Sequence, residues 1–583
     1  MSSARALRRL VSLGALLAPL ALVACGGLPT RHEIRTVRVV TADEPRADVD
    51  LRRIPALPEQ GQTPEAVVRG FLAAGAELDV ARQFLTPDNR WDPEAGAVVF
   101  DGTPTVTTDP AALPDATSVT VSVGLDVVLR IARDGSTRPD APSGEPFTLV
   151  LVRPSERDQW RISSVPDVLP LRGRDLAQAR RPGTLTWLAP GGRTLLADPV
   201  LLPSRRDALL ATAVDRLLAG PSARLAEVGV ASALPTGTTA VRVVQSGDEV
   251  LVDLAAVARA TPPAQKALAR AQVAGTLLSL PGVAAVRVLV DGQPFLPPGV
   301  RDDAPLTSAD VAAVAAAGGP GGTPPAAYVV GAGGHVEPLG SREEPVAAGG
   351  TVALAVAGDG QRTATLRRGA DGAVTLQVAR TPGATGVQVG GVGGWSSVSW
   401  ARDGGLWLVR DGRPMLRREG QEPQPVDAGG ALLRSLLVAP DGVHAVAVSS
   451  AGGLMAGLVS SSPPRLTDLH PVARRLRQVS RVAFDPAGPG VVLATGRVQA
   501  PGDESATAVW RVSVGVPDPT TDDLDGRPVQ LPPPCARAAV ESLGGGPGQQ
   551  SLAGCPDGTV RRLSSGDVWE PAGGGRLPTW STG

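Results

Sequence analysis

Residues 398–404 read VSWARDG, a short strand-forming run that ends in the turn-forming pair Asp403-Gly404. A strand-like run before such a turn recurs, in strict or looser form, at Asp359-Gly360, Asp441-Gly442, Asp485-Pro486-Ala487-Gly488 and Cys555-Pro556-Asp557-Gly558. The first spacings are 44 residues (359 to 403) and 38 residues (403 to 441). Because propeller blades repeat every 40 to 50 residues or so, residues 325–583 are predicted to form a β-propeller of about six blades. The alternative is a β-sandwich or a stack of unrelated hairpins.

The unit before this repeat, residues 171–300, combines helices with short strands. A helix is predicted from Asp207 to Leu218, with its apolar residues on one stripe, and Gly220-Pro221 ends it. A second helix is predicted from Pro263 to Leu280. Valines alternate from Val286 to Val290 along a final strand. This pattern predicts a small α+β domain.

The first folded unit, residues 61–170, is predicted to open with a helix. Thr63 is a favourable N-cap, and Pro64 suits the first helical position because its missing N–H would have no partner there. The apolar face of this helix contains Val67, Val68, Phe71 and Leu72. A second short helix is predicted to hold Val80, Phe84 and Leu85. Strand-like runs follow from Ser118 to Ile131, Phe147 to Val152 and Trp160 to Val165. Helices before strands predict a second small α+β domain.

The stretch 301–324 consists largely of Ala, Gly and Pro and ends in GGPGGTPP, which predicts a flexible linker. The expected fold class is therefore multidomain α+β and all-β, with two small α+β domains followed by a β-propeller. The expected segments are a signal peptide (1–24), a lipidated tether (25–60), an N-terminal α+β domain (61–170), a second α+β domain (171–300), the linker (301–324) and the propeller (325–583).

The N-terminus has the layout of a bacterial secretory signal. Three arginines precede the apolar run Leu10–Val23. That run of 14 residues is shorter than the roughly 20 that a spanning helix needs. Leu22-Val23-Ala24-Cys25 then matches the lipobox of bacterial lipoproteins. We therefore expect cleavage between Ala24 and Cys25, with N-palmitoyl and S-diacylglycerol groups on Cys25 anchoring the chain to the extracytoplasmic face of the cell membrane. The alternative is an ordinary signal peptide with an incidental cysteine.

The net charge and the cysteines indicate which partners and which covalent links to expect. The formal net charge is −1, so there is no overall basic field to attract nucleic acid, and none is expected as a partner. Outside the membrane, Cys535 and Cys555 would meet oxidising conditions, which predicts one disulfide between them. Two buried free thiols are the alternative.

The sequence contains no constellation that indicates catalysis. The four histidines are scattered without metal-ligand spacing: His32, His335, His444 and His470. The aspartates of the Asp-Gly pairs are turn formers first, although a hydrolytic dyad of two of them is an alternative. We predict no catalytic residue, metal or cofactor. Tryptophans of the propeller region are expected in its core, or alternatively exposed at a blade rim as partner-binding anchors.

The order of these units resembles the LpqB family of actinobacterial lipoproteins, which combine a lipobox, a small N-terminal domain, a GerMN domain (named from spore-germination proteins) and a C-terminal propeller. The resemblance covers almost the whole mature chain. Its most specific stretches are residues 25–29 (CGGLP), 215–222 (DRLLAGPS) and 283–292 (VAAVRVLVDG). The last two are similar to GerMN domains in particular.

The resemblance implies an accessory role in a two-component system of the MtrA–MtrB type. The lipoprotein would contact the extracytoplasmic domain of the sensor histidine kinase and regulate cell division and envelope homeostasis. Two alternatives remain, a sensor of a cell-wall ligand and an envelope hydrolase with its active site in the propeller. A sensor would need a concave, partly apolar pocket with a few polar groups, and a hydrolase would need clustered carboxylates.

Overall fold

The computed structural model describes residues 57–582 except for 109–115, 140–146, 156–157, 205, 318–324, 348, 487, 501–502, 505–506, 517–527, 536–539, 546–549 and 565–566. Contacts group Ala56–Gly583 as one unit. The lipobox with Cys25, the tether to residue 56 and His32 lie outside the described residues. Within the described ranges, no helix combines the length and apolar character that crossing a membrane requires.

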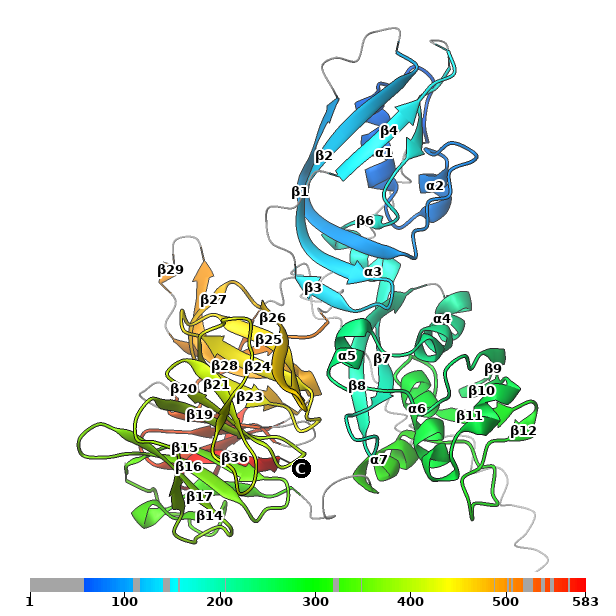
Figure 1. Cartoon of the computed structure of the whole chain (residues 1–583). Helices are drawn as coiled ribbons and strands as arrows, with labels where there is room; N and C mark the ends of the chain where they lie inside the picture. Colours follow the sequence, from blue (N-terminus) through cyan, green and yellow to red (C-terminus); the bar gives the residue numbers. More distant parts are fainter. Residues whose placement is uncertain are drawn as a thin grey trace, which may run out of the picture. The chain divides into compact units, whose positions relative to one another are not determined.

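The N-terminal domain packs two helices against a mixed sheet, in blue and cyan in Figure 1. Its elements are α1 (Pro64–Ala74), α2 (Leu78–Arg82), β1 (Gly96–Thr108), β2 (Ser118–Ala132), β3 (Thr137–Pro139), β4 (Phe147–Val152), β5 (Arg161–Ser164) and β6 (Leu169–Arg172). The strand order is β5-β4-β2-β1-β6, with β3 paired to β2. Only the pairing of β1 with β6 is parallel among these described strands.

Helix α1 begins where the sequence predicts. The Ala66 amide donates to the Thr63 hydroxyl at 3.3 Å, and Pro64 is the first helical residue. The predicted apolar face is almost fully buried at Val67, Val68, Phe71 and Leu72. The prediction for α2 was partly wrong, because the helix ends at Arg82 and Phe84 and Leu85 follow it as buried residues.

The second domain is built around a β-α-β unit and appears mainly in green in Figure 1. Its helices are α3 (Leu176–Ala179), α4 (Arg206–Ala219), α5 (Ala223–Glu227), α6 (Lys266–Leu278) and α7 (Ser308–Ala317). Its strands are β7 (Arg180–Leu188), β8 (Leu195–Pro203), β9 (Ala240–Ser246), β10 (Glu249–Leu254), β11 (Ala285–Val290) and β12 (Gln293–Pro294). Strands β10 and β11 are parallel, and α6 connects them and contacts β11 and β7. Helices α4 and α6 confirm the two helices predicted in this domain.

The linker prediction for 301–324 was wrong for its described part. Leu306 bridges to Val286, and α7 follows from Ser308 to Ala317. The Asp310 carboxylate accepts both the amide and the hydroxyl of Thr307, at 2.8 and 2.6 Å, which caps the start of the helix. An alanine-rich run has high helix propensity, and Val311 gives this helix an apolar contact with the domain core. Residues 318–324 lie outside the described residues.

The C-terminal region is a β-propeller, as predicted. Four blades follow the strands that open this region: β15–β18 begins at Thr351, β19–β22 at Trp395, β23–β26 at Leu433, and β27–β31 at Leu476. The fifth blade, β32–β35, begins at Ser542. The strands of blades one to three are β15 (Thr351–Ala357), β16 (Thr363–Arg368), β17 (Val374–Ala379), β18 (Val387–Val389), β19 (Trp395–Trp400), β20 (Leu406–Arg410), β21 (Arg413–Arg417), β22 (Gln424–Pro425), β23 (Leu433–Val438), β24 (His444–Ser449), β25 (Leu454–Ser461) and β26 (Pro464–Pro471). Those of blades four and five are β27 (Leu476–Asp485), β28 (Gly488–Ala500), β29 (Asp503–Glu504), β30 (Ala508–Ser513), β31 (Val529–Gln530), β32 (Ser542–Gly544), β33 (Leu552–Gly554), β34 (Thr559–Leu563) and β35 (Trp569–Gly574).

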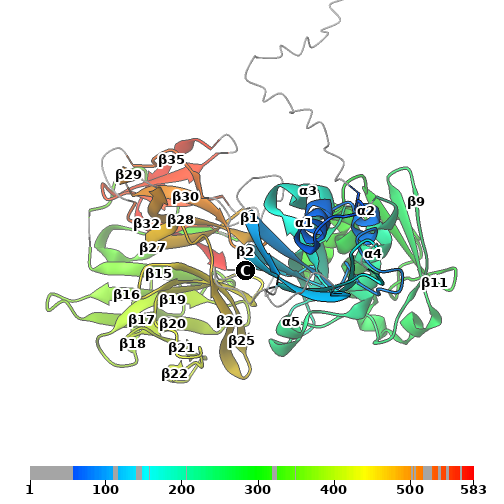
Figure 2. The ribbon, with the colours of Figure 1, turned by 90° about the horizontal axis from the view of Figure 1, so that it is seen from above.

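The ring closes through strands from both ends of the propeller. The remaining strands are β13 (Ala327–Val330), β14 (Val336–Pro338) and β36 (Arg576–Thr582). Strand β36 pairs antiparallel with β13 and parallel with β15, and it also contacts β32. Neighbouring sheets contact one another in sequence order, from green to red in Figures 1 and 2. The strands β14-β13-β36 therefore form a composite sixth blade among the described residues, and the β36–β15 pairing joins it to the first blade in one seven-stranded sheet.

The Asp-Gly repeat marks turns between blade strands. Asp359, Asp403 and Asp441 lie in the turn between the first and second strands of their blades, and Asp485 ends the first strand of its blade. In one example, the Asp403 carboxylate accepts the Gly405 amide at 2.9 Å, and Gly404 has a φ of +81°. Asp557 differs, because it joins the second strand β33 to the third strand β34. The Asp-Gly repeat therefore indicates where turns lie, but it does not indicate which two strands of a blade a turn connects.

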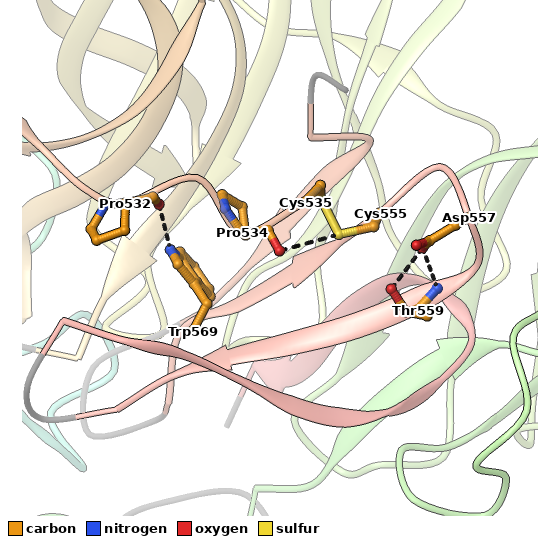
Figure 3. Close-up of a disulfide and its surroundings, with 7 residues drawn as sticks. All are labelled: Pro532, Pro534, Cys535, Cys555, Asp557, Thr559 and Trp569. Atoms are coloured by element: carbon orange, nitrogen blue, oxygen red, sulfur yellow. Dashed lines mark hydrogen bonds between the residues drawn. A yellow bond between two sulfur atoms is a disulfide. The ribbon is translucent and has the colours of Figure 1, made fainter. Parts of the chain in front are cut away.

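Cys535 and Cys555 are joined by a disulfide, with 5.6 Å between their Cα atoms (Figure 3). Nearby, the Trp569 indole donates to the Pro532 carbonyl oxygen at 2.9 Å. Trp569 is one of five propeller tryptophans that are buried in the core, the others being Trp395, Trp400, Trp407 and Trp510. Trp580 is half-buried and donates to the Gln550 carbonyl oxygen.

Candidate functional site at the domain junction

A bulge in strand β26 displaces Asp468 from regular pairing. In the β25–β26 ladder, Asp468 and Leu469 together oppose the single residue Gly457. Asp468 has a φ of +53°, a conformation that short polar residues tolerate better than most. A bulge of this kind redirects a side chain out of its strand. It leaves the Asp468 carboxylate free to contact residues that lie far away in the sequence.

The Asp468 carboxylate binds arginines from both α+β domains. The Arg224 guanidinium, on α5, donates Nη1–H to Asp468 Oδ2 at 3.2 Å, and its Nη2 lies 3.8 Å from Asp198 Oδ1 on β8. Arg138, on β3 of the N-terminal domain, forms an ion pair with Asp468 Oδ1. Asp198 Oδ2 also accepts the Trp187 indole N–H at 3.3 Å. We call Arg138, Asp198, Arg224 and Asp468 the domain junction, because they connect all three folded domains.

The two carboxylates of the domain junction are shielded from water. The Asp468 side chain is 7% exposed and the Asp198 side chain 5% exposed, whereas that of Arg138 is 59% exposed. Burial raises the pKa of Asp198, and the Arg224 guanidinium partly opposes that shift. Two acids and two bases make the cluster formally neutral. Such an arrangement suits a structural connection, because each buried charge has a partner.

Two histidines flank the domain junction. His470 Nδ1–H donates to the Asp468 carbonyl oxygen at 2.6 Å, and burial, followed by Arg138 and Arg224, lowers the pKa of His470 to about 4. The His444 ring lies 2.6 Å from the Asp441 carboxylate. Burial lowers the pKa of His444, but Asp441 outweighs this effect and holds it above the ordinary value. His470 is therefore neutral near pH 7.

The junction also lines a small cavity of about 60 Å³, with a wall that is partly polar and partly apolar. Asp198, Arg224, His444, Asp468 and His470 contribute to its wall. Leu458 also lines this cavity, and together with Val443 of the propeller it joins the apolar core cluster of the second α+β domain. A polar ion-pair cluster next to an apolar contact favours a stable interface between domains over a reaction centre.

The residues singled out in the sequence come together in two separate pairs, one of cysteines and one of histidines. Cys25 lies outside the described residues, so its lipidation stays a prediction. Cys535 and Cys555 form their disulfide in the fifth blade. His335 is exposed in the β13–β14 hairpin, whereas His444 and His470 line the junction cavity. Among the described residues, no group of three or more His, Cys, Asp or Glu side chains is arranged to hold a metal ion.

Sequence reasoning did not identify the residues of the domain junction. Arg224 and Asp468 are 244 residues apart, and neither residue is part of a motif, although residues 215–222 end just before Arg224. One available signal was Gly457, because a glycine inside a strand often marks a bulge or a close backbone approach. Such a glycine indicates a bulge in the strand, but it does not indicate which distant residue the bulge brings into contact.

Two family models match the α+β domains. Residues 57–177 match the family described as "Lipoprotein LpqB, N-terminal domain". Residues 184–295 match the family described as "Sporulation and spore germination". The two matches follow one another in the order that the family resemblance implies.

Related proteins match over a larger part of the chain. A "Lipoprotein LpqB" from Thermobifida fusca (strain YX) is 30% identical over 63% of this chain and 60% of its own length. This chain therefore matches less than two thirds of that relative. Proteins of the same name from Mycobacterium tuberculosis (strain CDC 1551 / Oshkosh) and Rhodococcus jostii (strain RHA1) are 27% and 26% identical. These matches cover 72% and 75% of this chain, respectively, and 76% of each relative.

Solved structures with similar parts are more distant. The first GerMN domain of the sporulation protein GerM from Bacillus subtilis is 19% identical, with a TM-score of 0.19, over 22% of this chain and 98% of that structure. The β-propeller domain of Cps50 (Swd1) from Myceliophteria thermophila is 14% identical, with a TM-score of 0.25, over 39% of this chain and 72% of that structure.

Two small α+β domains, the second of the spore-germination type, followed by a β-propeller define the chain as a multidomain α+β and all-β protein. The family models and the relatives then identify the group. The chain belongs to the LpqB family of lipoproteins. Its relatives bear the name of a lipoprotein and not that of an enzyme.

Proposed function

We propose that this chain is a lipid-anchored regulator of a two-component sensor histidine kinase of the MtrA–MtrB type. It would act outside the cytoplasmic membrane through contact with the extracytoplasmic domain of the kinase. The observation that supports this proposal most is the LpqB family membership across the N-terminal and spore-germination-type domains. The proposed action is non-enzymatic and depends on the surface that the connected domains present.

The domain junction supports a mechanism in which the propeller does not move independently of the domains nearer the anchor. Asp468 contacts arginines on both α+β domains, and its better shielded partner is Arg224 of the second domain. A partner that bound the propeller would thereby be linked to the lipidated N-terminus. In this proposal the junction sets the orientation in which the chain meets the kinase.

The contact can be tested with the full-length chain in detergent and the purified extracytoplasmic domain of the kinase. We expect saturable binding. The matched variant is Arg224→Gln, which removes one charge of the junction but keeps hydrogen-bonding capacity. We expect this variant to bind more weakly if junction geometry orients the interface. No binding at up to about 100 μM, which means less than about 5.5 kcal/mol of association free energy, would contradict direct contact.

The anchor is tested separately through Cys25. Replacing Cys25 with Ser removes the thiol that would carry the diacylglycerol, so we expect the protein to leave the membrane fraction. Mass spectrometry of the wild-type N-terminus should show acyl chains on residue 25. An unmodified Cys25 in membrane-bound protein would contradict the lipid anchor.

A further inference from the structure

The propeller contains a second cavity that the proposed kinase contact does not use. It has a volume of about 370 Å³ and lies where β15 and β36 begin, between the composite blade and the first blade. One wall is the β13–β14 hairpin, residues 331–334. Another is the segment that enters β15 at Thr351. All of its lining residues belong to the propeller.

Three arginines line this cavity, and one of them has no acidic partner. Arg576 is neutralised by Glu541, with which it makes two contacts. Arg342 Nε lies 3.6 Å from Glu337 Oε1. No carboxylate among the described residues forms an ion pair with Arg367. The cavity edge therefore carries one solvent-exposed guanidinium, that of Arg367, with which no carboxylate of the described residues pairs.

A buried hydroxyl in the same wall is also without a partner. Thr351 is 3% exposed, and its Oγ1 forms no hydrogen bond within the described chain. Buried polar atoms are nearly always paired, so an unpaired one calls for an explanation such as a ligand. A Cβ placed on Gly334 would be 3.7 Å from Thr351 Oγ1 and 3.6 Å from Arg367 Nη2. One small group beside Gly334 would thus be close to both the hydroxyl and the guanidinium.

The hairpin backbone brings a tight glycine turn to the edge of the cavity. Gly333 has φ 75° and ψ 1°, and Gly334 has φ 82°. The Gly334 N–H closes this turn by donating to the Gly331 carbonyl oxygen at 3.2 Å, so the side chains of Arg367 and Thr351 supply the donors of the site. Val330 and Val346, which are almost fully buried, supply its apolar wall.

We propose that this cavity binds an oxyanion, a phosphate or carboxylate group carried on a small organic molecule. Arg367 pairs with the charge, the Thr351 hydroxyl donates a hydrogen bond to it, and the apolar wall contacts the organic part. This site is independent of the proposed kinase contact, and its binding is measured without the kinase. Failure of either proposal therefore leaves the other standing.

The test titrates the full-length chain in detergent by calorimetry with inorganic phosphate, glycerol 3-phosphate and acetate. Sodium chloride at matched ionic strength serves as the control for general screening. We expect saturable binding of at least one oxyanion and none of chloride. Tighter binding of glycerol 3-phosphate than of inorganic phosphate would identify an organic phosphate as the ligand class, and preference for acetate would identify a carboxylate.

Three variants locate the binding. Arg367→Gln should weaken it about tenfold, the effect of losing a charge-assisted hydrogen bond, and the isosteric Thr351→Val about threefold. Arg368→Gln is the matched control, because Arg368 is exposed and does not line the cavity. Without ligand, Thr351→Val should unfold at the same temperature as wild type or higher, since it removes an unpaired buried hydroxyl. No binding of any oxyanion, or equal losses in the Arg367 and Arg368 variants, would overturn the proposal.

Discussion

At the scale of single residues, the domain junction depends on the Asp468 carboxylate. Arg224 and Arg138 approach its two oxygens from different domains, and the carboxylate is 7% exposed. Arg138 is largely in solvent, so its ion pair is screened and contributes little. Arg224 is better shielded and also faces Asp198. The ion pair with Arg224 should therefore account for most of the contribution of Asp468 to the free energy of unfolding.

Replacing Asp468 with Asn keeps the shape and the left-handed backbone but removes the charge. We expect the free energy of unfolding to fall by about 2 kcal/mol, because Arg224 loses its hydrogen-bonded partner and retains only Asp198. Thermal unfolding measured by calorimetry checks this. Asp411→Asn is the control, since Asp411 also has a positive φ but its carboxylate is exposed. Equal effects at both positions would contradict a special role for Asp468.

The protonation of His470 gives the junction a defined pH dependence. The pKa of His470 is about 4 in the folded chain, below the ordinary value of 6.5. The unfolded chain therefore binds a proton that the folded chain does not, between about pH 6.5 and pH 4. The free energy of unfolding should fall as the pH drops through this window, by at most about 3 kcal/mol, and His470 should contribute no pH dependence above it.

The variant His470→Gln isolates this contribution. Asp198 acts in the opposite direction, because its raised pKa makes the folded chain take up a proton first, but it is present in both proteins. We expect the variant to lose less stability than wild type between pH 7 and pH 4.5, as measured by denaturant unfolding. His335→Gln, at an exposed histidine, should behave as wild type. A pH dependence that is the same in all three proteins would exclude His470 as its source.

At the scale of secondary-structure elements, Gly457 on β25 lies opposite the β26 bulge that positions Asp468 of the domain junction. A Cβ on Gly457 would lie 3.1 Å from both Leu469 Cδ1 and the Thr467 carbonyl oxygen, so the strand would have to shift. We expect Gly457→Ala to lower the free energy of unfolding by about 1–2 kcal/mol and to displace Asp468 from Arg224. Gly453→Ala is the control, because its Cβ would meet only the Ser449 hydroxyl at 3.4 Å.

The two outcomes of the Gly457 experiment are distinguished by combining it with Asp468→Asn. If the bulge acts by positioning the carboxylate, the double variant should be little worse than the more harmful single variant, because neighbouring residues that serve one contact are not additive. Fully additive losses would show that Gly457 matters only for strand packing.

Elements with their own local signals were predictable from the sequence. Thr63 and Pro64 mark the start of α1 because capping chemistry acts within one turn. The Asp-Gly pairs mark blade turns because their hydrogen bonds reach only two or three residues ahead. Helix α7 was missed because an Ala-, Gly- and Pro-rich composition describes both linkers and alanine-rich helices. Only packing, through Val311, distinguishes the two.

At the scale of the whole molecule, the contacts that create candidate sites join distant parts of the chain. The β36–β13 pairing closes the propeller across about 250 residues, and Arg224 reaches Asp468 across 244. Such pairs leave no periodicity in the sequence. The Thr351 cavity has the same origin, because Arg367 and the hairpin residues 331–334 meet only after the blades are assembled. Sequence reasoning therefore identified the fold and the family but neither site.

Removing the disulfide tests how far closure of the propeller ring depends on the fifth blade. Cys535 and Cys555, separated by 20 residues, fasten the blade from which the chain runs on into β36, the strand that closes the ring. Replacing both with Ala releases a loop that the disulfide constrains in the unfolded chain, so we expect a loss of about 3 kcal/mol. In denaturant unfolding, the variant and chemically reduced wild type should have the same free energy of unfolding, and both values should be lower than that of the oxidised protein.

If the ring closes through strand pairing alone, the variant should still contain the β36–β13 pairing, detected as slow amide exchange in β36. Loss of that protection at low denaturant, while β19–β26 stay protected, would mean that the disulfide also holds the closure.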